Sequence, residues 1–461
     1  MQNNDKDYEY RKAVKLGLLV GLLGVSMGSL ADSAQSAAKG FVDDSHLNVL
    51  NRNFYFNRDM RHGGSNSLGR NRFKPVDERK GYREEWAHSV MAFYTSGFTQ
   101  GTVGFGLDAH AFLGLKLDSG GGRVGLNLLP TDSDGRPEDE YSEAGGALKL
   151  RVSDSVLKYG EQMPAAPIFA VSTVRLIPAT ATGWTLNVKE IEDLELNLGR
   201  FTSVNGVDST NSDDDLTTDY SVGITSKRVD YFGATYKVSD RLNVSFYGSE
   251  LKDVWRQYYG YAKYVWPVSD LQTLSLTLNA YRTHDTGKQL GDEIDNNAWS
   301  LAGTYNFGAH GLTLGYQEIN GDEPLDWIGF GSMGGNVFFT NASQFSTFAE
   351  ANERSWQLRY DLNMAGYGVP GLRFMARYTR GDGMDNSDSN NRFYTARHVY
   401  DPNKDNKHWE RNLEVSYVLQ SGPAKDLSLR VRHATHRATT GIRHFDMDEV
   451  RIIAEYPLNI F

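Results

Sequence analysis

Arginine residues recur at close, regular spacing in two stretches of this sequence. LSLRVRHATHR contains Arg430 and Arg432, and GLRFMARYT contains Arg373 and Arg377. A guanidinium group presents a planar fork of N–H donors, and neighbouring forks can bind a carboxylate through paired hydrogen bonds. These spacings therefore indicate recognition of anions, provided that the side chains point into one aqueous space.

Extended strands would give the arginines a common direction, because side chains alternate between the two faces of a strand. In LSLRVRHATHR the positions between the arginines are apolar, so one face is basic and the other is greasy. The clearest strand is 103–117, VGFGLDAHAFLGLKL, where every second residue from Val103 to Leu117 is apolar. This strand is longer than the usual five or six residues. It suits a membrane-spanning barrel or a long strand of a soluble β-protein.

The composition limits the classes of protein that are possible. The chain has 461 residues, a net charge of −10, 12% aromatic residues and no cysteine. The missing cysteines exclude disulfides and thiolate metal sites. The negative charge argues against a nucleic-acid partner. High aromatic and glycine content without long apolar runs is typical of barrels with aromatic girdles.

The N-terminus indicates export. Three basic residues precede an apolar run with small residues at its end, namely Arg11, Lys12 and Lys15 before residues 16–30. This pattern predicts a signal peptide, residues 1–31, cleaved after Ala31, with Ala34 and Ala37 as alternative sites. A buried N-terminal helix is the other interpretation of the run. With a signal peptide, the mature protein would leave the cytoplasm.

The remainder of the chain, residues 32–461, predicts a single all-β domain. Short turns and long polar loops alternate along it, which indicates a transmembrane antiparallel β-barrel of about eighteen strands, with roughly eight short turns at one rim and nine long loops at the other. The chain ends on Phe461, and a terminal aromatic residue is typical of such barrels. The predicted strands are 47–56, 86–93, 103–117, 148–152, 156–160, 184–189, 194–198, 228–238, 241–250, 257–266, 272–283, 297–307, 312–319, 354–364, 371–381, 409–420, 427–437 and 447–461.

Residues 161–183, EQMPAAPIFAVSTVRLIPATATG, are too apolar for an exposed connection. Apolar loops of this kind fold back and bury themselves. We expect this segment to lie inside the barrel.

The inward strand face is predicted to be net positive although the whole chain is negative. A charged side chain on the lipid face costs about 2–4 kcal/mol near the middle of the membrane, so charged residues are assigned to the lumen. Arginines there could bind solutes, or could pair with lumen carboxylates and loop carbonyls and only brace the wall. The basic set is Lys116, Lys149, Arg151, Lys263, Arg359, Arg373, Arg377, Arg430, Arg432 and Arg451, and the acidic set is Asp108, Glu195, Asp361, Glu414 and Glu455.

Several long segments resemble the OprD family, the carboxylate channels of pseudomonad outer membranes. They include MPAAPIF, VRLIPATATG, LELNLGRFTSVN, FGATYKVSDRLNVSFYGSELKDVWRQYYG, ERSWQLRYDLNMAGYGVPGLRFMARYTRGD, WERNLEVSYVLQSGPAKDLSLRVRHATHR and DEVRIIAEYPLNIF, in this order. The resemblance covers the chain from about residue 40 onward.

The resemblance implies a monomeric barrel of about eighteen strands that is narrowed by its third, fourth and seventh loops, here 161–183, 201–226 and 320–353. It also implies a ladder of basic side chains that leads solutes to the constriction. The predicted ladder is Arg359, Arg377, Arg430, Arg432 and Arg451, with Arg175 on the third loop. Lys149 and Arg151 complete the predicted substrate-binding set.

The function predicted from these observations is passive, substrate-selective diffusion of small carboxylate-bearing solutes across the outer membrane, aromatic or other monocarboxylic acids in particular. Tyr259, Tyr261 and Tyr281 would cover the body of such solutes. A channel for basic amino acids or small peptides is the main alternative, since the acidic run 213–215 could hold a cationic end. A plugged structural or adhesive barrel shares the same fold.

No enzymatic activity, cofactor or metal site is expected. The sequence contains no Gly-x-Ser-x-Gly motif, and His433, His436 and His444 have no carboxylate pattern around them that would make a metal site. The run 213–215 reads as a solvated loop more readily than as a calcium site. The expected partners are small carboxylate solutes, outer-membrane lipid and lipopolysaccharide.

Overall fold

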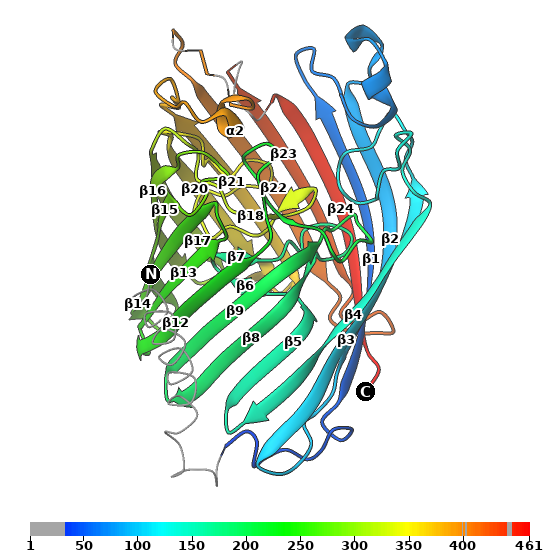
Figure 1. Cartoon of the computed structure of the whole chain (residues 1–461), viewed down its shortest axis with the longest axis vertical. Coiled ribbons are helices and arrows are strands. Elements are labelled where there is room, and N and C mark those ends of the chain that lie inside the picture. Colours follow the sequence, from blue (N-terminus) through cyan, green and yellow to red (C-terminus); the bar gives the residue numbers. More distant parts are fainter. Residues whose placement is uncertain (1–32, 399, 402, 440–444) are drawn as a thin grey trace, which may run out of the picture.

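In the computed structural model, eighteen strands form one antiparallel sheet that closes on itself (Figure 1). The structure describes residues 33–398, 400–401, 403–439 and 445–461, so the predicted signal peptide and His444 lie outside the described residues. The barrel strands are β1 (His46–Met60), β2 (Tyr82–Thr95), β3 (Val103–Asp118), β4 (Glu140–Val152), β5 (Ser155–Gln162), β8 (Thr180–Ile191), β9 (Leu194–Asn205), β12 (Val229–Ser239), β13 (Leu242–Leu251), β14 (Trp255–Ser269), β15 (Gln272–Asp285), β16 (Asp295–Phe307), β17 (His310–Asn320), β20 (Arg354–Asn363), β21 (Leu372–Asp382), β22 (Lys407–Val418), β23 (Ser428–Ala438) and β24 (Met447–Asn459).

The first and last strands close the barrel. β1 and β24 pair from Asn48 opposite Asn459 to Met60 opposite Met447. The backbone N–H of Leu47 also donates to the carbonyl oxygen of Phe461 over 3.1 Å. Closure matters because a free strand edge exposes unpaired N–H and C=O groups, which a lipid environment cannot satisfy.

The two faces of the strands differ as predicted. Along β3, Val103 and Phe105 are exposed on the outside, whereas Gly104 and Gly106 are buried. On β23, Leu429 and Val431 are exposed, and Arg430 and Arg432, which alternate with them, lie on the other face. The predicted alternation of apolar and polar faces is therefore confirmed on both strands.

The connections at one rim are mostly shorter than those at the other, and the clearest exception is the fifth loop. The short turns are 96–102, 153–154, 192–193, 240–241, 270–271, 308–309, 364–371 and 419–427. The loops at the other rim, which lies at the top of Figure 1, are 61–81, 119–139, 163–179, 206–228, 252–254, 286–294, 321–353, 383–406 and 439–446, numbered here first to ninth. The fifth loop has only the three residues 252–254, with Asp253 at a left-handed φ of 61°, so the predicted strict alternation is wrong there.

Three loops fold into the barrel, and two of them build a small sheet inside it. The third loop carries the hairpin β6 (Ala165–Ala166) and β7 (Phe169–Ala170). Strands from the fourth and seventh loops pair with one another, which no local sequence pattern predicted (β18 is visible inside the barrel in Figure 1). This inner sheet consists of β11 (Thr225–Ser226), β10 (Leu216–Thr218), β18 (Ile328–Phe330) and β19 (Met333–Gly334).

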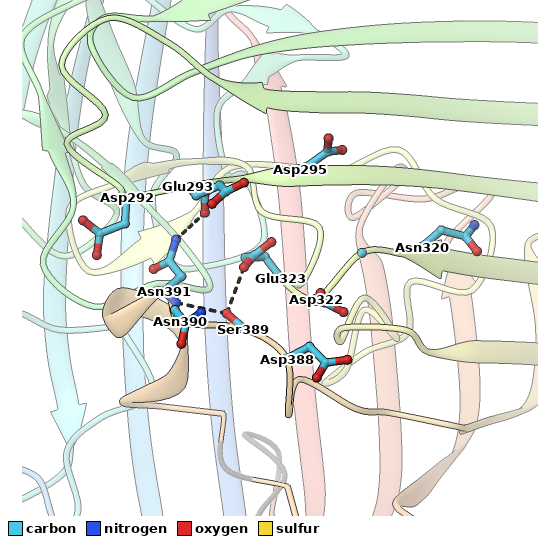
Figure 2. A pocket seen from close by; sticks show the side chains of 11 residues that line it. Asp292, Glu293, Asp295, Asn320, Asp322, Glu323, Asp388, Ser389, Asn390 and Asn391 are labelled. Atoms are coloured by element: carbon cyan, nitrogen blue, oxygen red, sulfur yellow. Dashed lines mark hydrogen bonds between the residues drawn. The ribbon is translucent and has the colours of Figure 1, made fainter.

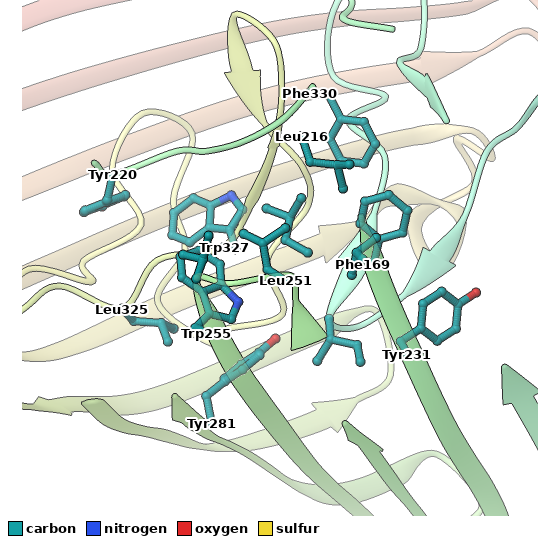
Figure 3. Close-up of a cluster of buried hydrophobic side chains, with 14 of the residues drawn as sticks. Phe169, Leu216, Tyr220, Tyr231, Leu251, Trp255, Tyr281, Leu325, Trp327 and Phe330 are labelled. Carbon is teal, nitrogen blue, oxygen red and sulfur yellow. The ribbon is translucent and has the colours of Figure 1, made fainter. Parts of the chain in front are cut away.

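Aromatic side chains fasten the inner loops to the wall (Figure 3). Phe169 of the third loop stacks on Phe330 of the seventh, with ring centroids 5.2 Å apart. Phe169 also contacts Phe201 of β9 and Tyr231 of β12. Aromatic pairs add about 0.5–1.5 kcal/mol beyond the area that they bury. The constricting loops therefore pack against one another and against the wall through a shared aromatic core.

The second loop also enters the barrel, which the sequence analysis did not anticipate. Leu126 and Leu128 are fully buried and belong to one cluster with Leu176 and Ile177 of the third loop. The carboxylate of Glu85 on β2 accepts hydrogen bonds from the backbone N–H groups of residues 125, 126 and 128, over 2.8, 2.9 and 2.9 Å. One buried side chain thus pins the second loop behind the third.

The helices of the described residues are short. They are η2 (Gly69–Phe73), η3 (Val76–Glu78), η4 (Met364–Tyr367) and α2 (Arg392–Thr395). Within the described ranges, none of the helices has the length and apolar character needed to cross a membrane.

Candidate functional site

Basic side chains line one wall of the lumen, where β20 to β24 adjoin β1. Arg359 on β20 lies directly opposite Arg377 on β21. Arg432 on β23 lies opposite Arg451 on β24, and Arg451 in turn lies opposite Phe56 on β1. Strand pairing therefore sets guanidinium groups beside one another around this wall.

Three guanidinium groups surround the ring of Phe56, and we call these four residues the Phe56 cluster. The carbon of the guanidinium lies 4.5 Å from the ring centroid for Arg451, 5.4 Å for Arg58 and 5.5 Å for Arg175. Glu449 pairs with Arg58 over 2.8 Å and with Arg451 over 2.6 Å. Glu449 thus pairs with two of the three cations, and the cluster keeps a net positive charge.

Arg175 reaches this cluster from the third loop. Its Nε donates to the carbonyl oxygen of Leu126 over 2.8 Å and its Nη1 to that of Val174 over 3.2 Å. Burial, followed by the nearby cations Arg451 and Arg58, lowers the pKa of Arg175. The same positive potential that disfavours the charge of Arg175 favours an anion beside it.

The seventh loop is held against the basic wall by arginines. Arg377 donates from Nε to Oδ1 of Asn412 and from Nη1 to the carbonyl oxygen of Ala342, both over 2.9 Å. Arg451 donates from Nη2 to the carbonyl oxygen of Gln344 over 3.1 Å. Part of the predicted ladder therefore also braces the wall.

The remaining predicted ladder arginines pair with carboxylates at different distances. Arg359 makes two hydrogen bonds of 2.8 Å to Asp361. Glu414 lies between two partners, with Oε2 2.9 Å from Nε of Arg432 and Oε1 3.6 Å from Nε of Arg430. Arg430 is therefore held least firmly of the three.

Lys149 and Arg151 lie apart from this group, next to the short-turn rim. Nζ of Lys149 lies 2.7 Å from Oδ1 of Asp108, and Nε of Arg151 donates to Oε1 of Gln35 over 2.9 Å. Both cations lie over the ring of Phe98, at 4.9 and 4.1 Å from its centroid. Their contacts tie the N-terminal segment and the first turn together.

A cavity of about 800 Å³ lies on the long-loop side of the Phe56 cluster, and we call it the vestibule. Four arginines line it, and Asp219 is the carboxylate in its described lining. The arginines are Arg58, Arg83, Arg175 and Arg397. A solute entering from the long-loop rim would meet a predominantly basic surface before the cluster.

Comparison with known proteins gives one consistent result. The family model described as outer membrane porin, OprD family, matches residues 39–460. The chain belongs to the OprD family. Porin D of Pseudomonas aeruginosa is 44% identical over 456 residues, covering 97% of this chain and 98% of Porin D. The crystal structure of Pseudomonas aeruginosa OprD superposes with a TM-score of 0.79 at 44% identity, covering 93% of this chain and 98% of that one.

A further relative was solved with a small solute. The structure of Pseudomonas aeruginosa OpdK with vanillate has a TM-score of 0.76 and 33% identity, covering 91% of this porin and all of that chain. The predicted family, barrel fold and outer-membrane location are confirmed, and the protein is a substrate-specific porin. Its relatives are channels rather than enzymes.

Sequence reasoning missed three lumen arginines of this porin. Arg58 follows the predicted end of the first strand at residue 56, and Arg83 precedes the predicted start of the second at residue 86, but both lie within longer observed strands. Arg52 lies inside the predicted strand 47–56, but apolar and polar residues do not alternate regularly along that stretch. Its guanidinium pairs with Glu455 over 2.7 Å and donates to the carbonyl oxygen of Leu176 over 3.3 Å. Extending both strands and fixing the register of the first would have found them.

The mouth of the porin carries charge of the opposite sign. A cavity of about 470 Å³ between the sixth, seventh and eighth loops, the acidic recess, is lined by carboxylates (Figure 2). Burial, then Asp322 and Glu293 nearby, raise the pKa of Glu323, although Ser389 donates to it over 2.8 Å. The carboxylates are Asp292, Glu293, Asp295, Asp322, Glu323 and Asp388. The acidic excess of the chain thus lies partly in the loops, as predicted.

Proposed function

We propose that this porin conducts small carboxylate-bearing solutes by passive diffusion, and that aromatic or other monocarboxylic acids are its main substrates. The observation that carries the proposal is the Phe56 cluster, where three guanidinium groups surround one ring and Glu449 pairs with only two of them. A carboxylate entering there would gain charge-assisted hydrogen bonds that the wall itself leaves partly unused.

The proposed path runs from the vestibule through the Phe56 cluster and along the ladder of Arg451, Arg432 and Arg430. At each step the carboxylate of the solute passes from one arginine to the neighbouring one, so that no single site binds the solute tightly. Arg430, whose Nε lies 3.6 Å from Glu414, has the weakest protein partner of the three and is suited to exchange it for a solute.

An aromatic body would find partners beside the cations. The ring of Phe56 lies within the cluster, and Phe345, which also lines the vestibule, lies 4.7 Å from the guanidinium carbon of Arg58. The relative solved with vanillate, an aromatic carboxylate, supports this class of substrate for the family member at hand.

A channel for basic amino acids is the second candidate, and two observations favour it. The vestibule includes Asp219, and the acidic recess lies at the long-loop rim. A solute with both a carboxylate and a cationic end could use both surfaces. The basic wall alone supports monocarboxylates, so the two candidates differ in whether a cationic end is required.

Replacing Arg430 and Arg432 together by Ala should test the ladder. We expect benzoate flux into liposomes containing the purified porin to fall at least tenfold, because two of the arginines along the proposed path are lost. Small-ion conductance should stay within a few fold, because the loops that set the pore width keep their contacts. K263A, which removes a lumen cation from β14, serves as the matched control.

The outcomes separate the candidates. Efficient arginine or lysine uptake with negligible benzoate uptake would overturn the monocarboxylate proposal while leaving the channel in place. Uptake that required a partner protein, or a gradient other than that of the solute, would overturn passive diffusion.

A further inference from the structure

A second cluster of chemically active side chains lies on the wall formed by β3, β4 and β5. His110, Glu143 and Glu161 come one from each strand, and one potential ligand atom from each lies within 4.8 Å of the others. His110 and Glu143 are each only 8% exposed. No metal site is expected from the sequence. These residues are separated by 33 and 18 positions, and only strand pairing brings them together.

Gly145 makes room for this cluster. It lies directly opposite His110 in the pairing of β3 with β4. A Cβ atom at this position would lie 2.1 Å from Oε2 of Glu161 and 2.9 Å from Cε1 of His110. Any larger residue would therefore push the carboxylate and the imidazole apart.

The cluster has too few hydrogen-bond donors and too little positive charge for its two carboxylates. Nε2 of His110 lies 3.4 Å from Oε1 of Glu143, longer than an ordinary hydrogen bond. Nε2 of His110 and Oε2 of Glu143 are buried without a hydrogen-bond partner among the described residues. The hydroxyl of Thr180 contacts both Glu143, over 2.9 Å, and Glu161, but its single hydrogen can serve only one of them.

The nearest lysines do not supply the missing charge. Nζ of Lys149 and Nζ of Lys158 lie 2.7 and 2.6 Å from the two oxygens of Asp108. Asp108 thus holds both lysines, and the two glutamates remain together beside one imidazole. Two carboxylates at this spacing repel one another unless a proton or a cation lies between them.

We propose that His110, Glu143 and Glu161 bind one divalent transition-metal ion, with zinc the best match. Zinc takes imidazole nitrogen and carboxylate oxygen at about 2.0–2.2 Å in tetrahedral geometry, which places neighbouring ligand atoms about 3.3–3.5 Å apart. The 3.4 Å between His110 and Glu143 fits that edge. Calcium instead takes six to eight oxygen ligands, which this set does not offer.

The surroundings suit an ion of this charge. Two carboxylates and a neutral imidazole bring a net charge of −2, which a divalent ion neutralises. His110 and Glu161 also line a cavity of about 200 Å³, which provides an entry path and space for a water as the fourth ligand. Glu161 and Thr180 flank the third loop, 163–179, so the bound ion would tie the root of that loop to β3 and β4.

Zinc titration of the purified, chelator-treated full barrel tests the proposal. Calorimetry with zinc chloride should detect one site per barrel, and both H110Q and E143Q should weaken it at least tenfold. E195Q changes a lumen glutamate that pairs with Lys189 over 3.2 Å, and it should leave the affinity unchanged. Calcium and magnesium chloride should bind more weakly than zinc at this site.

X-ray absorption of the zinc-loaded wild-type barrel gives a second readout that needs no variant. We expect nitrogen and oxygen neighbours at about 2.0–2.1 Å with the outer-shell signal of one imidazole. Heat-modifiable mobility on gels shows whether H110Q and E143Q have folded. The proposal is overturned by the absence of a stoichiometric site, by an affinity equal in E143Q and E195Q, or by a spectrum without imidazole. The first of these results is expected if the two glutamates simply share a proton.

Discussion

Individual arginines of the lumen differ in how strongly the protein itself occupies them. Arg359 has a bidentate carboxylate, whereas Arg430 and Arg432 share Glu414 at unequal distances. A guanidinium that already has a partner attracts a passing anion less. If the proposed ladder operates, the carboxylates of the wall therefore set how strongly each of its arginines attracts an anion.

Glu414 is the residue through which this tuning can be tested. E414Q removes the negative charge between Arg430 and Arg432 and keeps the side-chain volume. We expect the ratio of anion to cation permeability, measured from reversal potentials in a salt gradient, to rise. E195Q on the far wall should leave the ratio unchanged. A lower ratio in E414Q would show that the carboxylate positions the arginines instead of competing for them.

Which side of the barrel wall these lumen arginines face could be predicted from the sequence. The residues that they contact could not. Alternation in LSLRVRHATHR and the high cost of charge in lipid together assign Arg430 and Arg432 to the lumen. Arg175 could be placed on an inward loop only through its apolar neighbours and the family resemblance. Its contact with Leu126 depends on the second loop, whose path no local pattern indicates.

At the scale of elements, the constriction depends on loops packed behind one another. The second loop supports the third through Leu126, Leu128, Leu176 and Ile177. The sequence predicted the third loop because its apolar run is long. It missed the second because four apolar residues stand among glycine, aspartate and proline. Pairing of β10 with β18 joins segments more than 100 residues apart and so has no local signature.

Removing the support of the second loop should loosen the pore. E85A leaves three backbone N–H groups without their acceptor, two of them buried, and each buried loss costs about 1–3 kcal/mol. We expect larger open-channel current noise and a lower thermal midpoint, while the barrel still inserts. E195Q, which changes a glutamate on β9 that pairs with Lys189 and does not touch the second loop, provides the comparison. Equal noise in the two variants would refute a supporting role for Glu85.

The acidic recess predicts a pH dependence at the mouth of the porin. The pKa of Glu323 is raised, so the folded protein binds this proton more tightly than the unfolded chain does. Ionised Glu323 therefore destabilises the loops above its raised pKa, and stability returns as the pH falls through that value. E323Q should raise the thermal midpoint at pH 7, with the gain shrinking as the solution is acidified.

D388N offers a comparison within the same recess, because Asp388 is exposed whereas Glu323 is only 7% exposed. Its thermal midpoint should follow that of the wild type across the pH range. A gain in D388N as large as that in E323Q would mean that overall charge, and not burial of Glu323, governs the effect.

For the whole molecule, net charge and pore charge have opposite signs. The chain carries −10, yet the described vestibule is lined by four arginines and one aspartate. Salt screens interactions beyond about 8 Å at physiological ionic strength, so we expect the local cations to govern permeation. Reversal potentials of the wild-type porin should therefore show anion preference. A clearly cation-selective pore would contradict the basic lumen as the selectivity element.

The barrel architecture was the feature that the sequence predicted most completely. Period-two alternation, a count of about eighteen strands and length-sorted connections all follow from membrane geometry. The exception at 252–254 arises because a tight turn needs only Asp253 in a left-handed conformation, whereas the predicted strands ended short of it. Strand ends, unlike strand faces, carry weak signals in the sequence.

The pairing of β1 with β24 constrains the order in which the barrel can assemble. Its partners, residues 46–60 and 447–459, lie almost 400 residues apart, so the pair can form only after both segments have been synthesised. Contacts so distant in sequence form slowly, because the entropy of closing the loop opposes them. Until then both strands present open edges that invite aggregation. The newly exported polypeptide must therefore be kept apart from its neighbours throughout its crossing of the periplasm.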